Sequence, residues 1–267
     1  MPCYKSRPAW ATGEEGRKNI SFQFQNTTPD YYIDCGKCDG CRARNRTDWA
    51  TRIYHEAQMW DRNCFVTLTY DNEHLPPEIR KDDIQSFIKR LRKQSDRKIR
   101  YYAVGEYGEQ TRRPHYHAVI FNEDFLSSKY HYSVSDSMYG NSELQRTWGQ
   151  GQVTISAFNH ARAKYTAGYV TKKINDLDNF ALMSRQPPIG RTWLKENHDN
   201  IRRLETVNIE GKQIPIPRVY LNWLKGAETF DHIKENLRES VTPLSDQKLR
   251  AKKAHYLAQQ NLRTEKV

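Results

Sequence analysis

Two histidines separated by one residue, His115 and His117, constrain the fold of this chain more than any other feature. They open a run of apolar and β-branched residues that extends to Phe121 and predicts a β-strand. Side chains two residues apart on a strand point to the same side, so the two imidazoles project together, whereas Tyr116 and Ala118 face the other side. Two imidazoles on one face of a strand can bind a divalent metal ion.

The third metal ligand should come from a neighbouring strand. Residues 100–105 also predict a strand, and the polar stretch from Gly108 to Arg113 predicts a hairpin that joins the two. Glu106 ends the first strand and is the expected ligand, with Glu109 in the predicted turn as the alternative. Two imidazoles and one carboxylate suit Mn²⁺, or Mg²⁺ with weaker affinity. Alone, the histidine pair also fits an ordinary half-exposed strand, so the interpretation depends on a second motif.

The second motif is a predicted helix over residues 159–174 that carries two tyrosines one turn apart. Because each residue of a helix turns by about 100°, Tyr165, Tyr169 and Lys172 share one face. We expect both tyrosines to be nucleophiles, since a phenol attacks phosphorus once it has become a phenoxide. The Lys172 ammonium would favour the phenoxide and stabilise charge on a phosphate. A helix that packs its aromatic side chains in the core is the structural alternative.

Three of the five cysteines fall within seven residues, and a fourth lies near the N-terminus. In a reducing compartment this spacing indicates metal binding rather than disulfides. Cys35, Cys38 and Cys41 can converge on one ion, and Cys3 can complete a closed tetrahedral zinc site. An iron–sulfur cluster and unliganded thiols are the alternatives. Cys64 lies inside a predicted strand and is expected in the core.

The charge balance favours a polyanionic partner. Lys and Arg exceed Asp and Glu to give a formal net charge of +11, and each phosphate that a protein neutralises releases condensed counterions. A merely soluble basic protein is the alternative. The expected nucleic-acid contacts are Arg112 and Arg113, just before the histidines, and Lys173 at the margin of the tyrosine face. Further candidates, which equally fit solvated helix faces, are Arg42, Arg44, Arg46 and residues 89–93.

Neither a membrane span nor a secretory signal is expected. No run of residues approaches the roughly 20 apolar residues that cross a bilayer. The N-terminal residues lack the apolar segment of a secretory signal. With cysteines spaced for metal binding, these observations predict a cytoplasmic protein without a membrane partner.

The predicted elements divide the chain into three parts. Residues 1–60 hold the cysteine-rich segment and a helix, residues 61–178 hold the histidine and tyrosine motifs, and residues 179–267 form a C-terminal extension of unknown role. Strands separated by helices, with one pair joined as a hairpin, predict an α+β fold with an antiparallel sheet and helices on one face. Within the extension, residues 205–217 predict a hairpin and residues 246–263 a charged helix.

The elements between the motifs follow from local patterns. A capping box of Asp82 and Gln85 predicts the start of a helix with an apolar stripe and a basic outer face. The remaining expectations are a strand at 64–70, a loop insertion at 123–141, a short helix at 143–148 and a strand at 152–156.

As an ordered set, these motifs resemble the His-hydrophobic-His (HUH) endonuclease superfamily, which includes rolling-circle replication initiators, relaxases and some transposases. The similarity is greatest to the replication initiators of microviruses, particularly the gokushovirus branch. Residues 65–70, 105–117 and 165–173 resemble the three successive motifs of the superfamily, and the four N-terminal cysteines resemble that branch. One departure is Tyr116, which occupies a position usually filled by an aliphatic residue.

The resemblance implies a ferredoxin- or RRM-like core and a nicking and joining mechanism. One tyrosine attacks the origin strand and keeps its 5′ phosphate, and the freed 3′ hydroxyl primes synthesis. The second tyrosine then cuts the regenerated origin, and the released 3′ end attacks the first phosphotyrosine to close a circle. The expected cofactors are a catalytic Mn²⁺ or Mg²⁺ and a structural zinc ion.

The expected partners are single-stranded origin DNA of a small phage and a host polymerase and helicase in the bacterial cytoplasm. A transposase or relaxase with the same chemistry is one alternative. Such transposases are usually shorter and carry one tyrosine, and relaxases commonly place their histidines after the tyrosine. A non-catalytic module that binds single-stranded nucleic acid is the alternative from another class.

Overall fold

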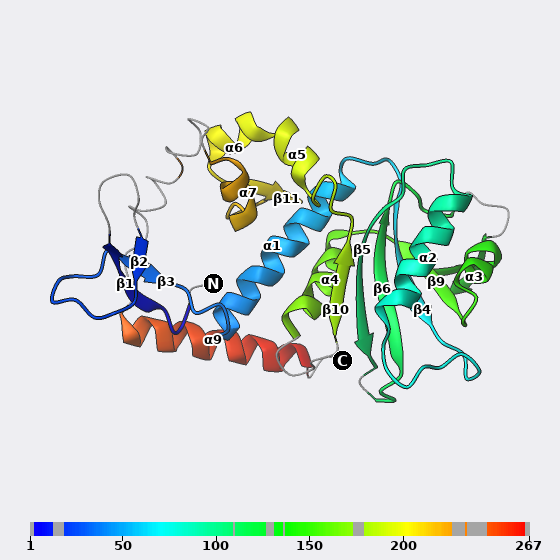
Figure 1. Ribbon diagram of the computed structural model, residues 1–267, viewed down its shortest axis with the longest axis horizontal. Helices are drawn as coiled ribbons and strands as arrows, with labels where there is room; N and C mark the ends of the chain where they lie inside the picture. Colours follow the sequence, from blue (N-terminus) through cyan, green and yellow to red (C-terminus); the bar gives the residue numbers. More distant parts are fainter. Residues whose placement is uncertain are drawn as a thin grey trace. The chain divides into compact units, whose positions relative to one another are not determined.

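The computed structural model describes residues 3–12, 19–108, 110–126, 131–135, 137–172, 179–225, 233 and 245–264. The chain divides into two compact units, one of Met1–Asn45 with Phe230–Val267 and one of Arg46–Thr229. Helix α1 (Asp39–Ala57) begins in the first unit and continues in the second (Figure 1). The second, larger unit contains the histidine and tyrosine motifs.

The smaller unit contains a three-stranded antiparallel sheet in the order β2-β1-β3. Its strands are β1 (Arg7–Thr12), β2 (Asn19–Ser21) and β3 (Tyr31–Ile33). Ala9 and Trp10 are buried, and the indole N–H of Trp10 donates a hydrogen bond to the carbonyl oxygen of Thr27 at 2.9 Å. Helix α9 (Asp246–Thr264) belongs to the same unit and confirms the expected charged terminal helix.

The larger unit is built on a seven-stranded sheet in the order β10-β5-β6-β4-β9-β8-β7, with every neighbouring pair antiparallel. The strands are β4 (Asn63–Thr69), β5 (Arg100–Tyr107), β6 (Pro114–Phe121), β7 (His131–Ser135), β8 (Met138–Asn141), β9 (Val153–Ala157) and β10 (Phe180–Met183). The helices that pack on this sheet, besides α1, are α2 (Lys81–Gln94), α3 (Ser142–Trp148) and α4 (His160–Lys172).

The centre of this unit has a ferredoxin-like order. Along the chain the elements run β4-α2-β5-β6-α3-β9, and in the sheet their strands lie in the order β5-β6-β4-β9. This is the split βαβ arrangement of a ferredoxin-like core. The hairpin β7–β8 is inserted between β6 and α3, and β10 extends the sheet beyond β5. The predicted α+β fold on an antiparallel sheet is confirmed.

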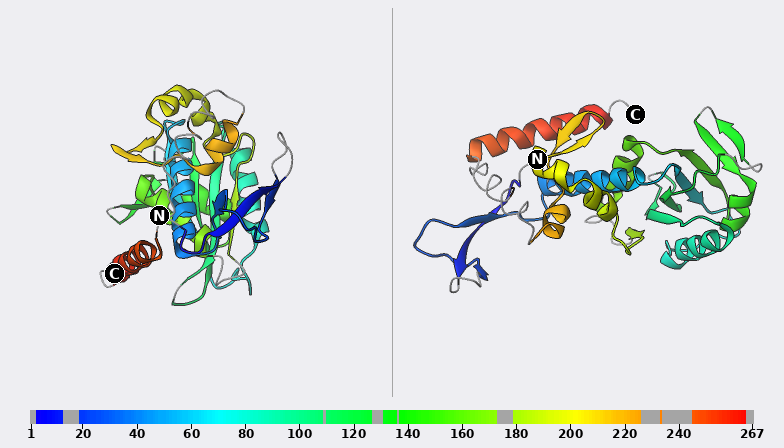
Figure 2. Two further views of the ribbon diagram at one scale, coloured as in Figure 1. Left: turned by 90° about the vertical axis from the view of Figure 1, so that its left-hand side faces the viewer. Right: turned by 90° about the horizontal axis from the view of Figure 1, so that it is seen from above.

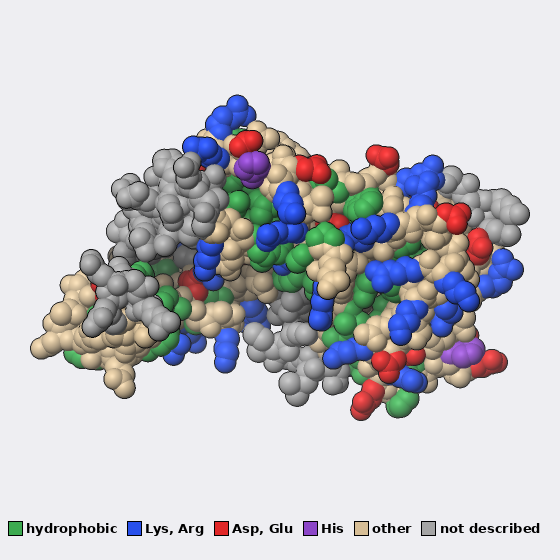
Figure 3. Space-filling view, turned by 45° about the horizontal axis from the view of Figure 1, so that its top comes forward, with side chains coloured by type: hydrophobic (Ala, Val, Ile, Leu, Met, Phe, Trp, Pro, Cys, Tyr) green, Lys and Arg blue, Asp and Glu red, His purple; other side chains and the backbone are tan. Residues whose placement is uncertain are grey.

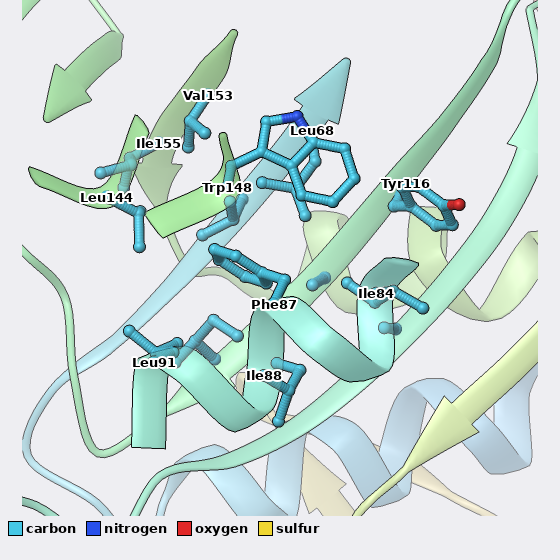
Figure 4. Packing of buried hydrophobic residues seen from close by; sticks show 14 of the residues in the cluster. Leu68, Ile84, Phe87, Ile88, Leu91, Tyr116, Leu144, Trp148, Val153 and Ile155 are labelled. Atoms are coloured by element: carbon cyan, nitrogen blue, oxygen red, sulfur yellow. The ribbon is translucent and has the colours of Figure 1, made fainter. Parts of the chain in front are cut away.

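Helices cover both faces of the sheet. Alternate residues of β4 point to opposite sides, as the strand period requires. Cys64, Val66 and Leu68 face α2 and α3, where Phe87 and Trp148 fill the core (Figure 4). On the other face, the side chains of α1 and α4 pack against β4, β5 and β6. The sequence predicts helices on one face of the sheet, and α2 and α3 form that layer. The layer of α1 and α4 on the other face, which the sequence pattern did not indicate, is visible in Figures 1 and 2.

The rest of the larger unit is made of short elements that follow β10. They are α5 (Arg191–Glu196), α6 (His198–Leu204), β11 (Val207–Ile209), β12 (Lys212–Ile214) and α7 (Arg218–Trp223). Strands β11 and β12 pair antiparallel, which confirms the hairpin expected around residues 205–217. Among the helices in the described part of the chain, none has the length and apolar character to span a bilayer.

Two local expectations are wrong. The capping box does not form, because α2 begins after Arg80 and has no side-chain cap; it is α3 that is capped, by the Asn141 side chain. The described part of the expected loop over residues 123–141 contains the hairpin β7–β8. Apolar side chains of this hairpin, such as Val134 and Met138, are exposed, so the alternation that reveals a half-buried strand is missing.

Candidate metal and nucleophile site

The structure brings together the three residues that the sequence predicts as ligands of the catalytic metal. Glu106 of β5 lies directly opposite His115 of β6, and His117 follows two residues later on the same face. Oε1 of Glu106 lies 3.0 Å from Nε2 of His115 and 3.1 Å from Nε2 of His117. All three possible ligand atoms are within 4.8 Å of one another, as a shared metal ion requires. We call these residues the Glu-His-His cluster.

The second ring nitrogen of each histidine has a partner of its own. Nδ1 of His115 lies 3.2 Å from the carbonyl oxygen of Arg113, and Nδ1 of His117 lies 3.0 Å from Oγ1 of Thr67. A carbonyl oxygen only accepts, so Nδ1 of His115 carries the proton. With Nδ1 engaged in this way, Nε2 of each ring is directed at Glu106 and would offer its lone pair to a metal ion bound between them, as metal-binding histidines do. The cluster therefore fits a divalent cation.

Electrostatics in the cluster favour a charged carboxylate. Burial would raise the pKa of Glu106, but hydrogen bonds from His115 and His117 outweigh burial and lower that pKa to about 2. Burial opposes a charged His115, yet its bonds to Glu106 and to the Arg113 carbonyl raise its pKa above the usual value. The deeper His117 has a lowered pKa, chiefly because of burial. A cation, whether proton or metal, is thus stabilised beside a permanently ionised Glu106.

Tyr165 of α4 reaches the same place from the neighbouring layer. Its hydroxyl oxygen lies 3.5 Å from Nε2 of His117, and the two rings meet edge to face with centroids 5.2 Å apart. Ala163 and Ala167 are buried against the sheet and hold this face of α4 close to β6. Tyr165 itself is 43% exposed, so its side chain is partly open to solvent. The packed-core alternative for this tyrosine does not hold.

The other predicted residues of the tyrosine motif are described less completely. Helix α4 extends through Tyr169 and Lys172, so the expected helical spacing from Tyr165 is present. The side chains of Tyr169 and Lys172 lie outside what the structure describes, and so do the residues Lys173 and Glu109. Their participation in the site stays a prediction.

Arg162 is a residue of the site that the sequence reasoning missed. It lies one helical turn before Tyr165, and its guanidinium carbon is 5.0 Å from the centroid of the Phe65 ring. That ring stacks on His117 with centroids 5.3 Å apart, and the charge of Arg162 contributes to the low pKa of His117. The sequence could have indicated Arg162, because a residue three positions before Tyr165 lies on the same face of a helix.

The two arginines of the β5–β6 turn have structural partners. The guanidinium of Arg113 donates to Oδ1 of Asn72 at 2.9 Å and to the carbonyl oxygen of Tyr70 at 3.1 Å. Arg112 has a left-handed backbone, with φ of 54°, and its guanidinium lies 5.0 Å from the centre of the Tyr107 ring. Arg113 thus holds the segment after β4 beside the cluster, and its predicted contact with DNA remains a prediction.

Tyr116 points away from the Glu-His-His cluster. Its surroundings explain why a tyrosine stands where the motif usually has an aliphatic residue. Its hydroxyl donates to the carbonyl oxygen of Arg80 at 2.6 Å and lies 2.7 Å from the Tyr70 hydroxyl. Tyr70 in turn donates to Asp83 at 2.7 Å. Burial raises the pKa of Tyr116 to about 12. A phenol replaces an aliphatic side chain here because its polar end has partners inside the core.

The four N-terminal cysteines form a second group that can bind a metal. The sulfur atoms of Cys3, Cys35, Cys38 and Cys41 all lie within 4.8 Å of one another. Backbone N–H groups point at three of them, from Cys35 to Cys3, from Tyr4 to Cys38 and from Cys38 to Cys35, each at 3.3 Å. Burial would raise the pKa of Cys35, but the backbone and thiol hydrogen bonds lower it to about 6. Cys64 is buried in the sheet, as expected.

Known proteins resemble this chain over the same motifs. The model of the family "Replication-associated protein ORF2/G2P" matches residues 63–174, from the start of β4 to the residues that follow α4. Replication-associated protein VP4 of Bdellovibrio phage phiMH2K is 36% identical over 214 residues, which cover 73% of this chain and 68% of that protein. Replication-associated protein ORF2 of Spiroplasma virus 4 is 33% identical, over 78% of this chain and 73% of that protein.

A third relative, replication-associated protein ORF4 of Chlamydia phage 1, is 33% identical over 171 residues. These cover 58% of this chain and 42% of that protein. No solved structure matches the chain.

Proposed function

Because the chain belongs to the family of phage replication-associated proteins, we propose that it initiates rolling-circle replication by nicking and rejoining single-stranded origin DNA through a 5′-phosphotyrosine bond. One observation carries this proposal: the Tyr165 hydroxyl lies 3.5 Å from Nε2 of His117, a member of a cluster that fits a divalent cation. A nucleophile and a phosphate-binding cation must meet at such a distance for in-line attack.

In the proposed site Glu106, His115 and His117 hold the cation, for which Mn²⁺ and Mg²⁺ are the proposed ions. A bound cation polarises and orients the scissile phosphate. Thr67 and the Arg113 carbonyl bind the opposite nitrogen of each ring, so each Nε2 would be directed at an ion held by Glu106. Arg162, one helical turn before Tyr165, lies over the Phe65 ring and adds positive charge near His117.

The proposed reaction exchanges one phosphodiester bond for another. Tyr165 loses its proton, its oxygen bonds to phosphorus, and the bond from phosphorus to the 3′ oxygen breaks. The leaving 3′ oxygen takes up a proton and becomes the primer for synthesis. Tyr169, one helical turn further, cuts in the second half of the cycle, and Lys172 stabilises the charges that develop. The phosphotyrosine keeps the bond energy, so rejoining needs no nucleotide cofactor.

The formation of a covalent adduct tests this function. Incubation with a single strand that contains the phage origin and Mn²⁺ should give labelled DNA that migrates with the protein in a denaturing gel. Tyr165→Phe and Tyr169→Phe should each retain some cleavage, and the double variant none. Tyr132→Phe is the matched control, because this exposed tyrosine of β7 bonds only to Gln145 among described residues. Adduct in the double variant would move the nucleophile elsewhere.

The same experiment separates the alternative functions. A non-catalytic binding module would retain the strand without any adduct in the presence of any divalent ion. A transposase or relaxase would also form an adduct, but residual cleavage in each single tyrosine variant and none in the double variant would favour the replication initiator. Single-stranded origin DNA is the proposed substrate. A host polymerase and helicase are the proposed partners, in the cytoplasm of the bacterial host, and zinc is the proposed ion of the four cysteines.

A further inference from the structure

A cavity of about 680 Å³ lies where the loop between α2 and β5 meets the residues that follow β10. Four of the residues that line it, Arg92, Arg97, Lys98 and Arg185, are exposed cations, and no Asp or Glu lines it. We call it the basic cavity. Its composition is that of a site for a polyanion, because lining cations that outnumber the neighbouring carboxylates create a local positive potential.

The charged groups of the basic cavity differ in how they are held. Arg92 is fixed in place, since its guanidinium donates to the carbonyl oxygen of Ile99 at 3.1 Å and to the Ser184 hydroxyl at 3.3 Å. Lys98 and Arg185 have no carboxylate partner within the described part of the chain. Arg97 is exposed and lies 3.6 Å from the half-buried Glu123, a long contact and therefore a weak pair.

A fifth lining cation, Arg100, is already used by the fold. Its guanidinium is buried and lies 2.6 Å from a carboxylate oxygen of Glu56. It also donates to the carbonyl oxygens of Gln186 and Pro187, at 3.1 and 2.7 Å. Arg100 therefore shapes the wall of the basic cavity and leaves the binding of an anion to the four exposed cations.

The basic cavity is distinct from the Glu-His-His cluster. Strand β5 begins at Arg100 beside the cavity and carries Glu106 near its other end, roughly 20 Å away at the rise of a strand. Arg92 also lies over Tyr101, on the face of the sheet that α2 covers, whereas Glu106 and the histidines lie on the face of α4. One nucleotide cannot occupy both places.

We propose that the basic cavity binds the sugar–phosphate backbone of a DNA segment that flanks the one being cut. The phosphate chemistry follows from the four cations, and the choice of DNA rests on the function proposed above. Lys and Arg side chains gather on the visible face of the part that holds the seven-stranded sheet, with Asp and Glu side chains mostly toward its edges (Figure 3). Along a strand with the 3.4 Å rise of B-DNA, the separation from Glu106 corresponds to roughly six nucleotides.

The test is the salt dependence of DNA binding. In a triple variant, Arg97→Gln with Lys98→Gln and Arg185→Gln, the affinity for a labelled single strand of about 40 nucleotides should fall by roughly tenfold or more. The slope of log affinity against log salt should decrease by about 2, since each lost phosphate contact accounts for about 0.7 on single strands. The base sequence of the labelled strand does not matter, because contacts to the sugar–phosphate backbone do not distinguish bases.

The matched control carries the same charge change on another surface, as Lys195→Gln with Arg202→Gln and Arg203→Gln, all exposed on α5 and α6. It should lower the affinity and the slope much less. Equal losses in both triple variants, or no loss in the first, would overturn the proposal.

Competition separates a DNA backbone from a small phosphate compound. If inorganic triphosphate binds the wild type but not the first triple variant, and displaces no DNA, the cavity is a site for small anions and the DNA assignment is wrong. Adduct formation by the wild type is measured separately, so failure of the proposed nicking function and failure of this cavity give different results.

Discussion

At the scale of single residues, the hydroxyl of Thr67 shows most clearly how one side chain orients another, because it contacts the imidazole of His117. Thr67 of β4 and His117 of β6 are direct partners in the sheet, and Oγ1 lies 3.0 Å from Nδ1 of the imidazole. If this nitrogen donates its proton to the hydroxyl, the other nitrogen is left free for a metal. Thr67 thus acts on the proposed metal site through His117, as a positioning residue.

Replacing Thr67 with valine keeps the shape of the side chain and removes the acceptor. We expect Thr67→Val to weaken Mn²⁺ binding by about 10- to 100-fold, because outer partners of metal-binding histidines contribute on this scale. Thr67→Ser should restore most of the affinity. Thr69→Val is the control, since its hydroxyl bonds to the Gln152 carbonyl oxygen instead. Isothermal titration with Mn²⁺ measures the effect, and equal affinity in Thr67→Val and wild type would contradict it.

The sequence predicts some site residues and not others for a physical reason. His115, His117 and Glu106 are joined by one hairpin, so the strand period and a short turn fix their relation. The contact of Thr67 with His117 spans 50 residues, and that of Arg162 with Phe65 crosses from α4 to β4. Such contacts depend on the order of strands and the packing of layers, which local patterns do not determine.

At the scale of elements, α1 connects the sheet to the short helices that follow β10. His55 of α1 stacks on Trp193 of α5 with centroids 3.4 Å apart, and its Nδ1 lies 3.1 Å from the Tyr220 hydroxyl of α7. The next residue, Glu56, accepts hydrogen bonds from Arg100 of β5 and from the backbone of Gly190. The buried imidazole of His55 and the buried ion pair of Glu56 therefore hold α5, α7 and β5 against α1.

The buried imidazole makes stability depend on pH. Burial lowers the pKa of His55 from 6.5 to about 3. Between these values the unfolded chain binds a proton that the folded chain does not, so the free energy of unfolding falls as the pH is lowered from about 6.5 to about 3. The limit is about 1.4 kcal/mol per pH unit for this one group.

His55→Phe keeps an aromatic ring against Trp193 and removes the titrating group. Urea unfolding between pH 7 and about 4 should show a smaller loss of stability toward acid in this variant than in the wild type. The exposed His198 provides the control, because His198→Phe should leave the pH dependence as it was. If His55→Phe and the wild type lose stability in parallel, the imidazole is not the group responsible.

Long elements with a buried face were predictable, and short edge elements were not. The apolar stripe of α2 meets a core on one side, so its period is visible in the sequence. The central strand β4 is buried on both faces and is recognised by its β-branched and aromatic residues. β10 and β8 have only four residues each, and β7 has largely exposed side chains at the far edge of the sheet. Their pairing depends on backbone hydrogen bonds, which any sequence can supply.

At the scale of the whole molecule, the four N-terminal cysteines connect distant parts of the smaller unit. Cys3 precedes β1, whereas Cys41 lies in the first turns of α1, 38 residues later in the chain. A metal ion shared by their sulfurs would close that loop, and ligand binding to the folded state adds directly to its stability.

We therefore expect about one zinc ion per chain in protein purified without chelator. Cys38→Ser should lose most of the metal and should become more sensitive to proteolysis in residues of the smaller unit. Cys64→Ala is the control, because Cys64 is buried in the sheet of the larger unit and belongs to neither metal-binding group. Mass spectrometry of the native protein gives the metal content. Full zinc content in Cys38→Ser would reject the site.

The hairpin β5–β6 has a consequence for the order in which the chain becomes active. Glu106 and His117 are only 11 residues apart, whereas the contact of Tyr165 with His117 spans 48 residues. Hairpins close within microseconds, and more distant contacts form later. As the polypeptide leaves the ribosome, the residues of the Glu-His-His cluster are synthesised before Tyr165. In the proposed mechanism a nascent chain would thus bind its cation before the nucleophile is in place, and Co²⁺ absorption should precede nicking competence when the denatured protein refolds.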